Sequence, residues 1–271
     1  MKIAGLDIGT TGCKLTVFDE QGERLGKTYR EYPVSRNSNG HEVDINAMTE
    51  SVYDTIREMA AAYPDIGAIG VTSFGETFVM VGVEGKPLYP GLLYTDPRGR
   101  DECAELVRRV GAGKITRITG LVPHRMYSIS KIMWIRDHEP ETYAKTRRIF
   151  LIEDYFVWLL TGKAQIDHAL ATRTMAFDIN SLGWSREIFE AAGIDTSLMS
   201  EPVPAGTPAG KVTPEAEGLT GLDPDCRIVS SAHDQVAAAI GAGAFDGSVA
   251  VDGAGTVECM TPVYDTLPDI I

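Results

Sequence analysis

The first 32 residues alternate between short apolar runs and small-residue or charged turns. Apolar residues dominate 2–6 and 13–18, a small-residue turn lies between them at 7–12, and a third β-type run extends from 24 to 32. Short runs separated by glycine-containing turns are typical of antiparallel strands. The pattern therefore predicts a three-stranded β-meander at the start of the chain.

Helical spacing of apolar residues begins near residue 46 and continues to Tyr63, with Asn46 as the expected N-cap. Further helices are expected at 99–110, 128–137, 154–160 and 235–242. Further β-type runs lie at 66–72, 77–83, 148–152, 227–231, 248–252 and 257–262. Residues 201–225, rich in Pro and Gly, are expected to form a connecting loop. Strands that alternate with helices after a meander predict an α/β or α+β domain with a mixed sheet.

Composition and charge narrow the class of protein. The chain has 271 residues, of which 44% are hydrophobic, which suffices for one large or two small domains. Its net charge of −13 argues against nucleic acid or an anionic membrane as the main partner. The four cysteines show no C-x-x-C spacing, and no apolar run approaches the roughly 20 residues that span a bilayer. A cytoplasmic protein is therefore expected.

The turn after the first apolar run carries candidate chemistry. Asp7 ends a strand that looks buried and is followed by Ile8-Gly9-Thr10-Thr11-Gly12. Glycines let a backbone approach a ligand closely, threonine hydroxyls can bond phosphate oxygens, and a carboxylate can hold a hydrated Mg²⁺. An ordinary hairpin turn would also fit this pattern, so the segment alone leaves both interpretations open.

A second candidate lies where the run at 227–231 meets the helix at 235–242. Asp234 there could cap the helix, or could take a proton from an attacking hydroxyl at the carboxyl end of a strand. His233 is a weaker candidate base, since a lone histidine is more often structural. A third segment, 251–256, repeats the strand–glycine–threonine pattern of the first. The stretch Gly111–Thr116 does not form a P-loop, because Ile115 follows Lys114.

These segments belong to a collinear series that resembles the FGGY carbohydrate kinases, which include glycerol kinase and xylulokinase. The matching stretches are LDIGTTGCKLTVFDEQG, AIGVTSFGETFVM, GLLYTDPR, SKIMWIRDHEPETY, IEDYFVWLLTGK, ATRTMAFDINSLGW, SSAHDQVAAAIGAG and AVDGAGTVECM. The resemblance implies an α/β actin-like ATPase fold with a ribonuclease-H-like mixed sheet and flanking helices. It also implies transfer of the ATP γ-phosphate to a hydroxyl of a ketose or polyol, with Mg²⁺, by a homodimer in the full-length form.

The resemblance further implies roles for individual residues. Asp234 would be the general base, and Asp7 would lie near the catalytic Mg²⁺. The expected substrate-binding residues are Glu76, Tyr94, Asp96 and Gln235. The expected phosphate-binding and nucleotide-binding residues are Gly9, Thr10, Thr11, Lys14, Gly255 and Thr256. If these roles are right, Asp7 and Asp234 must open onto a common groove.

The chain departs from the family pattern in length and in sequence. It has about half the family's length, so we expect a sugar-binding domain at 1–244, the beginning of a nucleotide-binding domain at 245–271, and weak or no activity alone. Gly75 stands where glycerol kinase has Arg, and xylulokinase's Met-His pair is also missing, so neither substrate carries over. The alternatives are a non-catalytic sugar-binding or sensor module and another actin-like phosphotransferase. The presence of both Asp7 and Asp234 favours an enzyme.

Overall fold

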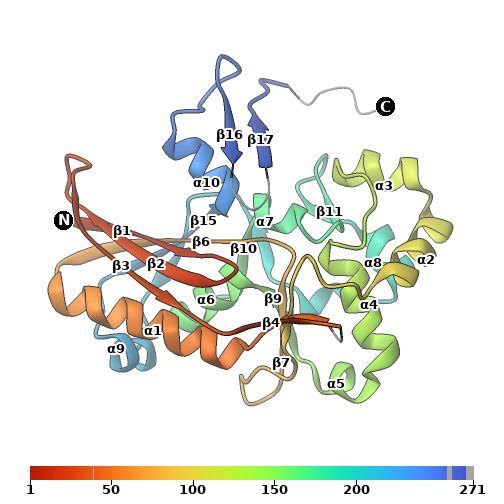
Figure 1. The fold of residues 1–271 in the computed structure, drawn as a ribbon, viewed down its shortest axis with the longest axis horizontal. Helices are drawn as coiled ribbons and strands as arrows, with labels where there is room; N and C mark the ends of the chain where they lie inside the picture. The colour runs from red at the N-terminus through yellow and green to blue at the C-terminus, as the bar shows by residue number, and fades with distance from the viewer. Residues whose placement is uncertain (39, 255–257, 267–271) are drawn as a thin grey trace.

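A six-stranded mixed sheet forms the centre of the molecule, in the order β14-β15-β6-β1-β2-β3 (Figure 1). The computed structural model describes residues 1–38, 40–254 and 258–266. Strands β1, β6 and β15 run parallel, whereas β2, β3 and β14 are antiparallel to their neighbours. The six strands are β1 (Lys2–Ile8), β2 (Gly12–Phe18), β3 (Arg24–Glu31), β6 (Ile66–Ser73), β14 (Thr207–Lys211) and β15 (Arg227–His233). The predicted meander and mixed sheet are confirmed.

Three helices lie together on one side of this sheet: α1 (Ile45–Ala62), α6 (Ile152–Thr161) and α9 (Pro214–Thr220) (Figure 1). Alternate residues of the strands, such as Leu6 and Ile8, are fully buried in the cluster that these helices share. The N-cap of α1 is Asp44, whose Oδ1 accepts from the Asn46 and Ala47 amides at 2.9 and 3.2 Å. The prediction that Asn46 caps this helix is wrong because the apolar face begins one residue earlier, at Ile45.

A second, mainly helical part packs around its own apolar cluster (Figure 1). Its helices are α2 (Arg100–Val110), α3 (Ala112–Thr119), α4 (Ser128–His138), α5 (Pro140–Lys145), α7 (His168–Thr172) and α8 (Arg186–Ala192), with a 3₁₀ turn at Thr196–Leu198. The short strands are β4 (Val34–Asn37), β5 (Gly40–Val43), β7 (Phe78–Val81), β8 (Gly91–Leu92), β9 (Arg148–Leu151), β10 (Gln165–Asp167), β11 (Phe177–Asp178), β12 (Gly183–Trp184) and β13 (Glu201–Val203).

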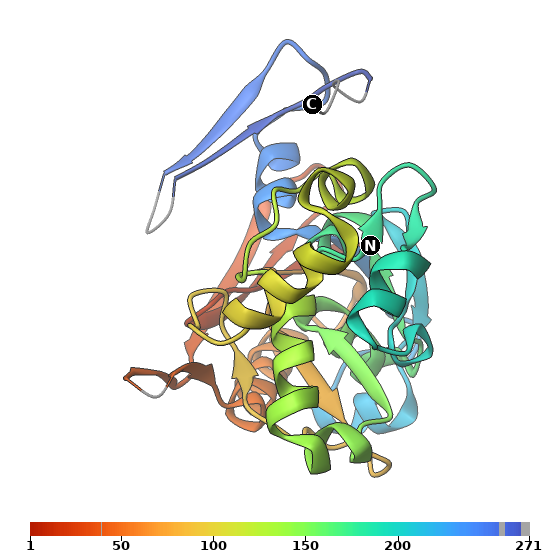
Figure 2. The same cartoon turned by 90° about the vertical axis from the view of Figure 1, so that its right-hand side faces the viewer.

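The last described elements project from this body. Helix α10 (Asp234–Gly241) follows β15 directly. Among the described strands, β16 (Ala250–Ala254) and β17 (Glu258–Pro262) pair only with each other. Figure 2 shows this hairpin standing away from the rest of the molecule. Large apolar side chains on the segment are exposed, among them Phe245 at 75% and Met260 at 61%. None of the helices in the described part of the chain is long and apolar enough to cross a bilayer.

The expected loop at 201–225 is wrong. It contains β13, β14 and helix α9. Thr213 caps α9 by accepting from the Ala216 amide, and Pro214 occupies the first turn of that helix. Proline is favoured at this position because its missing N–H would have had no helical partner. In this segment, proline and glycine therefore begin and end short elements, since Gly221 closes α9 in the left-handed conformation.

Candidate functional site

The central parallel strands bring the two candidate carboxylates to one edge of the sheet. Asp7 on β1 pairs with Thr72 of β6, and Ala232 on β15 pairs with the same residue from the other side. Asp234 follows two residues later, at the start of α10. The carboxyl ends of parallel strands are where open α/β sheets place their ligands. Residues 227 positions apart in the chain thus flank the end of one strand.

A cavity of about 400 Å³ opens at this edge. Its lining includes five residues that the sequence singles out, namely Thr10, Glu76, Tyr94, Asp234 and Gln235. The other lining residues are Phe74, Gly75, Met126, Arg173, His233, Gly253, Ala254 and Cys259. Asp7, Gly9, Thr11, Lys14 and Asp96 do not line it. Gly255 and Thr256 lie outside the described residues.

Asp234 has the electrostatics of a proton acceptor near neutral pH. Burial raises the pKa of Asp234 to about 6, and the negative charges of Asp7 and Glu76 add to the effect. Its Oδ1 accepts from the Gln235 amide at 2.7 Å and lies 3.2 Å from Nε2 of His233. Above pH 6 the carboxylate is ionised, and a base poised near the working pH is the most effective kind.

His233 does not share this property. Burial lowers the pKa of His233 to about 3, and the nearby positive charge of Arg173 lowers it further. An uncharged imidazole with so low a pKa is a poor proton acceptor in water at neutral pH. Its position beside Asp234 instead allows it to orient that carboxylate through Nε2.

The turn after β1 holds a partly exposed ion pair. Lys14 Nζ lies 2.6 Å from Oδ2 of Asp7, and both side chains are about one-third exposed, at 39% and 33%. The turn is closed by the Gly9 amide, which donates to the Gly12 carbonyl at 2.9 Å, and the Tyr32 hydroxyl donates to the Gly9 carbonyl. These hydrogen bonds fix the conformation of the turn, and Thr10 lines the cavity.

Glu76 sits in a strained backbone conformation. Its φ is +64°, and the Thr77 amide donates to the Gly75 carbonyl at 2.8 Å, which makes Glu76 the centre of a γ-turn. Such a turn with positive φ is rare and costly for a residue with a side chain. The Ser128 hydroxyl holds the turn by donating to the Glu76 carbonyl at 2.8 Å. The strain places a carboxylate in the cavity, and strained residues cluster at functional sites.

Arg173 is the site residue that sequence reasoning missed. Its Nε donates to Oε1 of Glu76 at 2.7 Å, and its Nη2 contacts the same oxygen. The guanidinium also lies over the Tyr127 ring, 5.2 Å from its centre. Arg173 belongs to the matching stretch ATRTMAFD, but no spacing rule links it to Glu76, which is 97 positions away.

The structure does not bring Asp96 to the cavity. Its buried carboxylate accepts from Nε and Nη2 of Arg98 at 2.8 and 2.6 Å and from the His41 amide at 2.7 Å. Arg98 also reaches Glu42 at 2.6 Å. Both oxygens of Asp96 are thus occupied within the protein. Asp96 fixes the loop that carries Tyr94 rather than offering an oxygen to a ligand.

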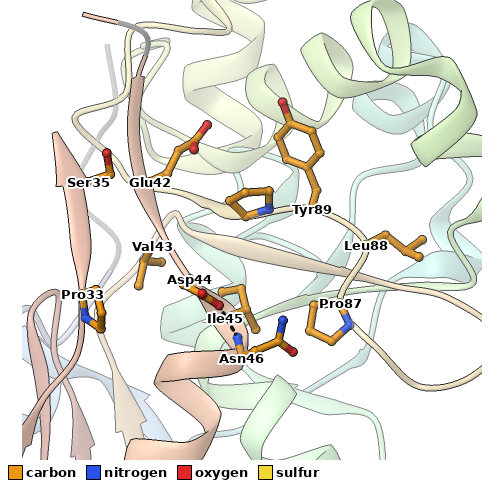
Figure 3. Close-up of a pocket in the computed structure, with 11 residues that line it drawn as sticks. Pro33, Ser35, Glu42, Val43, Asp44, Ile45, Asn46, Pro87, Leu88 and Tyr89 are labelled. Atoms are coloured by element: carbon orange, nitrogen blue, oxygen red, sulfur yellow. Dashed lines mark hydrogen bonds between the residues drawn. The ribbon is translucent and has the colours of Figure 1, made fainter. Parts of the chain in front are cut away.

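A second hollow of about 420 Å³ lies elsewhere, between the β4–β5 hairpin and residues 87–90 (Figure 3). Its charged groups already have partners within the protein. Asp44 points at the Asn46 amide as the cap of α1, and Glu42 pairs with Arg98. This hollow therefore offers little chemistry compared with the cavity beside Asp234.

Comparison with known proteins agrees with this geometry. Residues 2–241 match the FGGY family of carbohydrate kinases, N-terminal domain. A xylulose kinase of Staphylococcus xylosus is 24% identical over 90% of this chain and 51% of its own length. A glycerol kinase of Thermococcus onnurineus is 31% identical over 90% of this chain and 50% of its own length. The chain thus spans about half the length of these relatives.

Solved structures show the same fold. A structure titled as a xyloylose kinase from Brucella ovis superposes with a TM-score of 0.89 at 26% identity, over 96% of this chain and 54% of that one. A ligand-bound xylulose kinase from Lactobacillus acidophilus gives the same TM-score at 23% identity, over 96% and 53%. The expected actin-like ATPase fold is confirmed. On the match over 2–241, the chain belongs to the FGGY family of carbohydrate kinases.

Proposed function

We propose that this chain carries the sugar-binding half of an ATP-dependent kinase that phosphorylates a hydroxyl of a ketose or polyol. The single observation that supports it most is the position of Asp7 and Asp234 on either side of the end of β6. Asp234 opens into the cavity, and the charge of Asp7 acts on it. Phosphoryl transfer needs positioning and charge neutralisation with a carboxylate facing the nucleophilic oxygen, and this edge supplies those parts.

Asp234 would accept the proton of the attacking hydroxyl as its oxygen bonds to phosphorus. Glu76, Tyr94 and Gln235 would hold the substrate in the cavity, and these polar groups would reject analogues that lack the matching hydroxyl. Asp96 would act through the loop that it holds, since both its oxygens are already bonded.

The residues around Asp7 fit Mg²⁺ and phosphate. Only Oδ2 of Asp7 is engaged by Lys14, and the carboxylate is partly exposed. No group of three or more potential ligand side chains is found among the described residues. Mg²⁺ commonly takes one or two carboxylates and keeps its waters, so Asp7 suits it. The ion would neutralise phosphate charge, and Gly9, Thr10, Thr11 and Lys14 would contact phosphate oxygens.

The proposed domain boundary falls after α10. Residues 1–244 would form the sugar-binding domain and 245–271 the beginning of a nucleotide-binding domain, to which Gly255 and Thr256 would contribute. The separate pairing of β16 with β17 supports this division. The homodimeric state and the cytoplasmic location stay predictions.

The test is phosphorylation of a panel of ketoses and polyols with ATP and Mg²⁺, using the full-length gene product and its Asp234→Asn variant. The variant should bind the sugar with unchanged affinity and lose turnover by orders of magnitude. If no member of the panel is phosphorylated while one binds, a sensor fits better than a kinase. If Asp234→Asn turns over normally, Asp234 is not the base.

A further inference from the structure

The pair formed by Glu76 and Arg173 presents free hydrogen-bonding atoms to the cavity. Nε and Nη2 of Arg173 both donate to Oε1 of Glu76. Among the described residues, no hydrogen bond reaches Nη1 of Arg173 or Oε2 of Glu76. Both residues line the cavity. The pair therefore leaves donors on Nη1 and an acceptor on Oε2 free for a ligand, and a polyol that carries several hydroxyl groups can bond to both.

The surrounding structure holds this pair in place. Tyr127 stacks under the guanidinium, and the Ser128 amide and hydroxyl both reach the Arg173 carbonyl at 3.4 Å. Gly75 leaves the room that the pair needs. A Cβ added there would lie 2.9 Å from Cγ of Arg173 and 3.1 Å from the His233 ring. The missing side chain at 75 thus permits an arginine from α7's end to enter the cavity.

The charges facing the cavity disfavour an anionic ligand. Arg173 is the single positively charged lining residue in the described part of the chain, and Glu76 already neutralises it. Asp234 adds a negative charge, and Asp7 lies close enough to act on it. A carboxylate brought into this cavity would meet more negative than positive charge and would compete with Glu76 for the guanidinium. An uncharged polyol carries no charge for these carboxylates to repel, and its hydroxyls can exchange hydrogen bonds with water for hydrogen bonds with the lining.

We propose that Arg173 is a substrate-binding residue that determines specificity, and that Arg173 and Glu76 together bind two adjacent hydroxyls of an uncharged polyol or ketose rather than a sugar acid. This inference rests on the proposed kinase function, because it assigns the substrate class of the same cavity. Residues 74–76 are Phe, Gly and Glu and carry no positive charge, so Arg173 supplies the cationic donor of the pair.

Isothermal titration of the 271-residue chain tests the inference without requiring turnover. The probes are uncharged polyols and ketoses of three to six carbons, among them glycerol and xylitol. Each is compared with the aldonate of the same length, which adds a negative charge. Glycerol is compared instead with 1,3-propanediol, which lacks adjacent hydroxyls. The tightest neutral probe should bind at least about tenfold more tightly than its aldonate or its analogue without adjacent hydroxyls. Arg173→Gln should weaken its binding at least about tenfold and remove the preference for adjacent hydroxyls.

Matched variants separate recognition from folding. Arg186→Gln removes another arginine–glutamate pair, on the exposed face of α8, and should leave binding unchanged. Arg173→Lys keeps the positive charge beside Glu76 but lacks the planar guanidinium. It replaces Arg173→Gln as the test variant if Arg173→Gln does not fold, and it should also bind the polyol more weakly than the wild type. Tighter binding of the aldonate, or unchanged binding by both Arg173 variants, overturns this inference alone. Failure of every neutral and anionic probe to bind contradicts the kinase proposal as well.

Discussion

At the scale of the residue, the site combines groups that sequence motifs reveal with groups that only folding brings together. Asp7 and Asp234 each follow an apolar run at a strand end, so their chemistry could be predicted locally. Arg173 could not, because its contact with Glu76 depends on the γ-turn at 75–77 and on the backbone hydrogen bonds that join residues 173–174 to the start of α4. Asp96 shows the reverse case. The sequence predicts that it binds substrate, but its carboxylate is hydrogen-bonded to Arg98 within the protein.

The ionisation of Asp234 gives the first prediction at this scale. Carbon-13 NMR of labelled aspartate in the 271-residue chain should show a carboxyl that titrates near pH 6 and is absent from Asp234→Asn, which separates it from the buried Asp154 and Asp167, whose pKa values burial also raises. Because the charge of Glu76 raises the pKa of Asp234, Glu76→Gln should move this midpoint to lower pH. If the proposed kinase function holds, kcat/KM of the kinase that contains this chain should fall as pH drops below 6, since a protonated carboxyl cannot accept the substrate proton. A midpoint near 4 in the wild type would contradict the geometry.

A second residue-scale prediction concerns Glu153, which lies fully buried beside Asp167 at the start of α6. Burial raises the pKa of Glu153 well above its ordinary value, and the charge of Asp167 adds to this. The folded state therefore holds a proton that the unfolded state releases above pH 4–5, so the free energy of unfolding falls as pH rises through that window.

Glu153→Gln should reduce this fall in the free energy of unfolding at high pH, because glutamine has no proton to release. At pH 8 the variant should be more stable than the wild type by on the order of 1–2 kcal/mol, with little difference at pH 4. Urea unfolding at the two pH values measures this. Glu190→Gln, on an exposed pair with Arg186, is the control and should show no such dependence. Equal stability of Glu153→Gln and wild type at pH 8 would show that the buried carboxyl is not costly.

At the scale of the element, hydrophobic periodicity predicted the meander, α1, the main helices and the parallel strands to within a few residues. It failed for short pieces. The β4–β5 hairpin, α7 and α8 are too short for a period to show, and the glycines and prolines of 201–225 begin and end elements that were expected to be loop. The strand order could not be read from the pattern, because β6 lies between β1 and β15 through contacts that span most of the chain.

Helix α4 carries an element-scale prediction through Lys131. Its fully buried Nζ donates to the Leu93 and Met126 carbonyls, both at 2.8 Å. These carbonyls belong to the loops that carry Tyr94 and Met126 into the cavity wall, so Lys131 ties the two loops together. Burial lowers the pKa of Lys131 to about 7, opposed by the charges of Glu76 and Asp96.

Lys131→Met should leave both carbonyls without a donor, at a cost of roughly 1–3 kcal/mol for each group. Urea unfolding should show this loss, and the affinity for the best polyol should fall in parallel as the wall loosens. Lys114→Met removes an exposed pair with Glu187 and should cost less than about 1 kcal/mol. A Lys131→Met variant as stable as the control would rule out the clamp.

At the scale of the whole molecule, the last described segment forms part of the cavity wall but takes no part in the hydrophobic cores. None of the described residues beyond 244 belongs to either apolar cluster, and within the described part of the chain β16 and β17 pair only with each other. Yet Gly253, Ala254 and Cys259 form one wall of the cavity, and a Cβ at Gly253 would lie 2.7 Å from Oε1 of Gln235. We therefore expect the hairpin to contribute more to ligand binding than to folding.

A chain ending at residue 244 should therefore keep the fold and lose affinity. Its free energy of unfolding in urea should stay close to that of the 271-residue chain, since the deletion removes no described residue of either apolar cluster. The polyol that binds the longer chain should bind the shorter one more weakly, because one wall is gone. Its ligand-induced rise in melting temperature should shrink accordingly, as this rise follows the ratio of ligand concentration to Kd. Cooperative unfolding of 1–244 with undiminished binding would show that the hairpin is no part of the site, whereas loss of folding would show that residues 245–271 complete the first domain rather than begin a second.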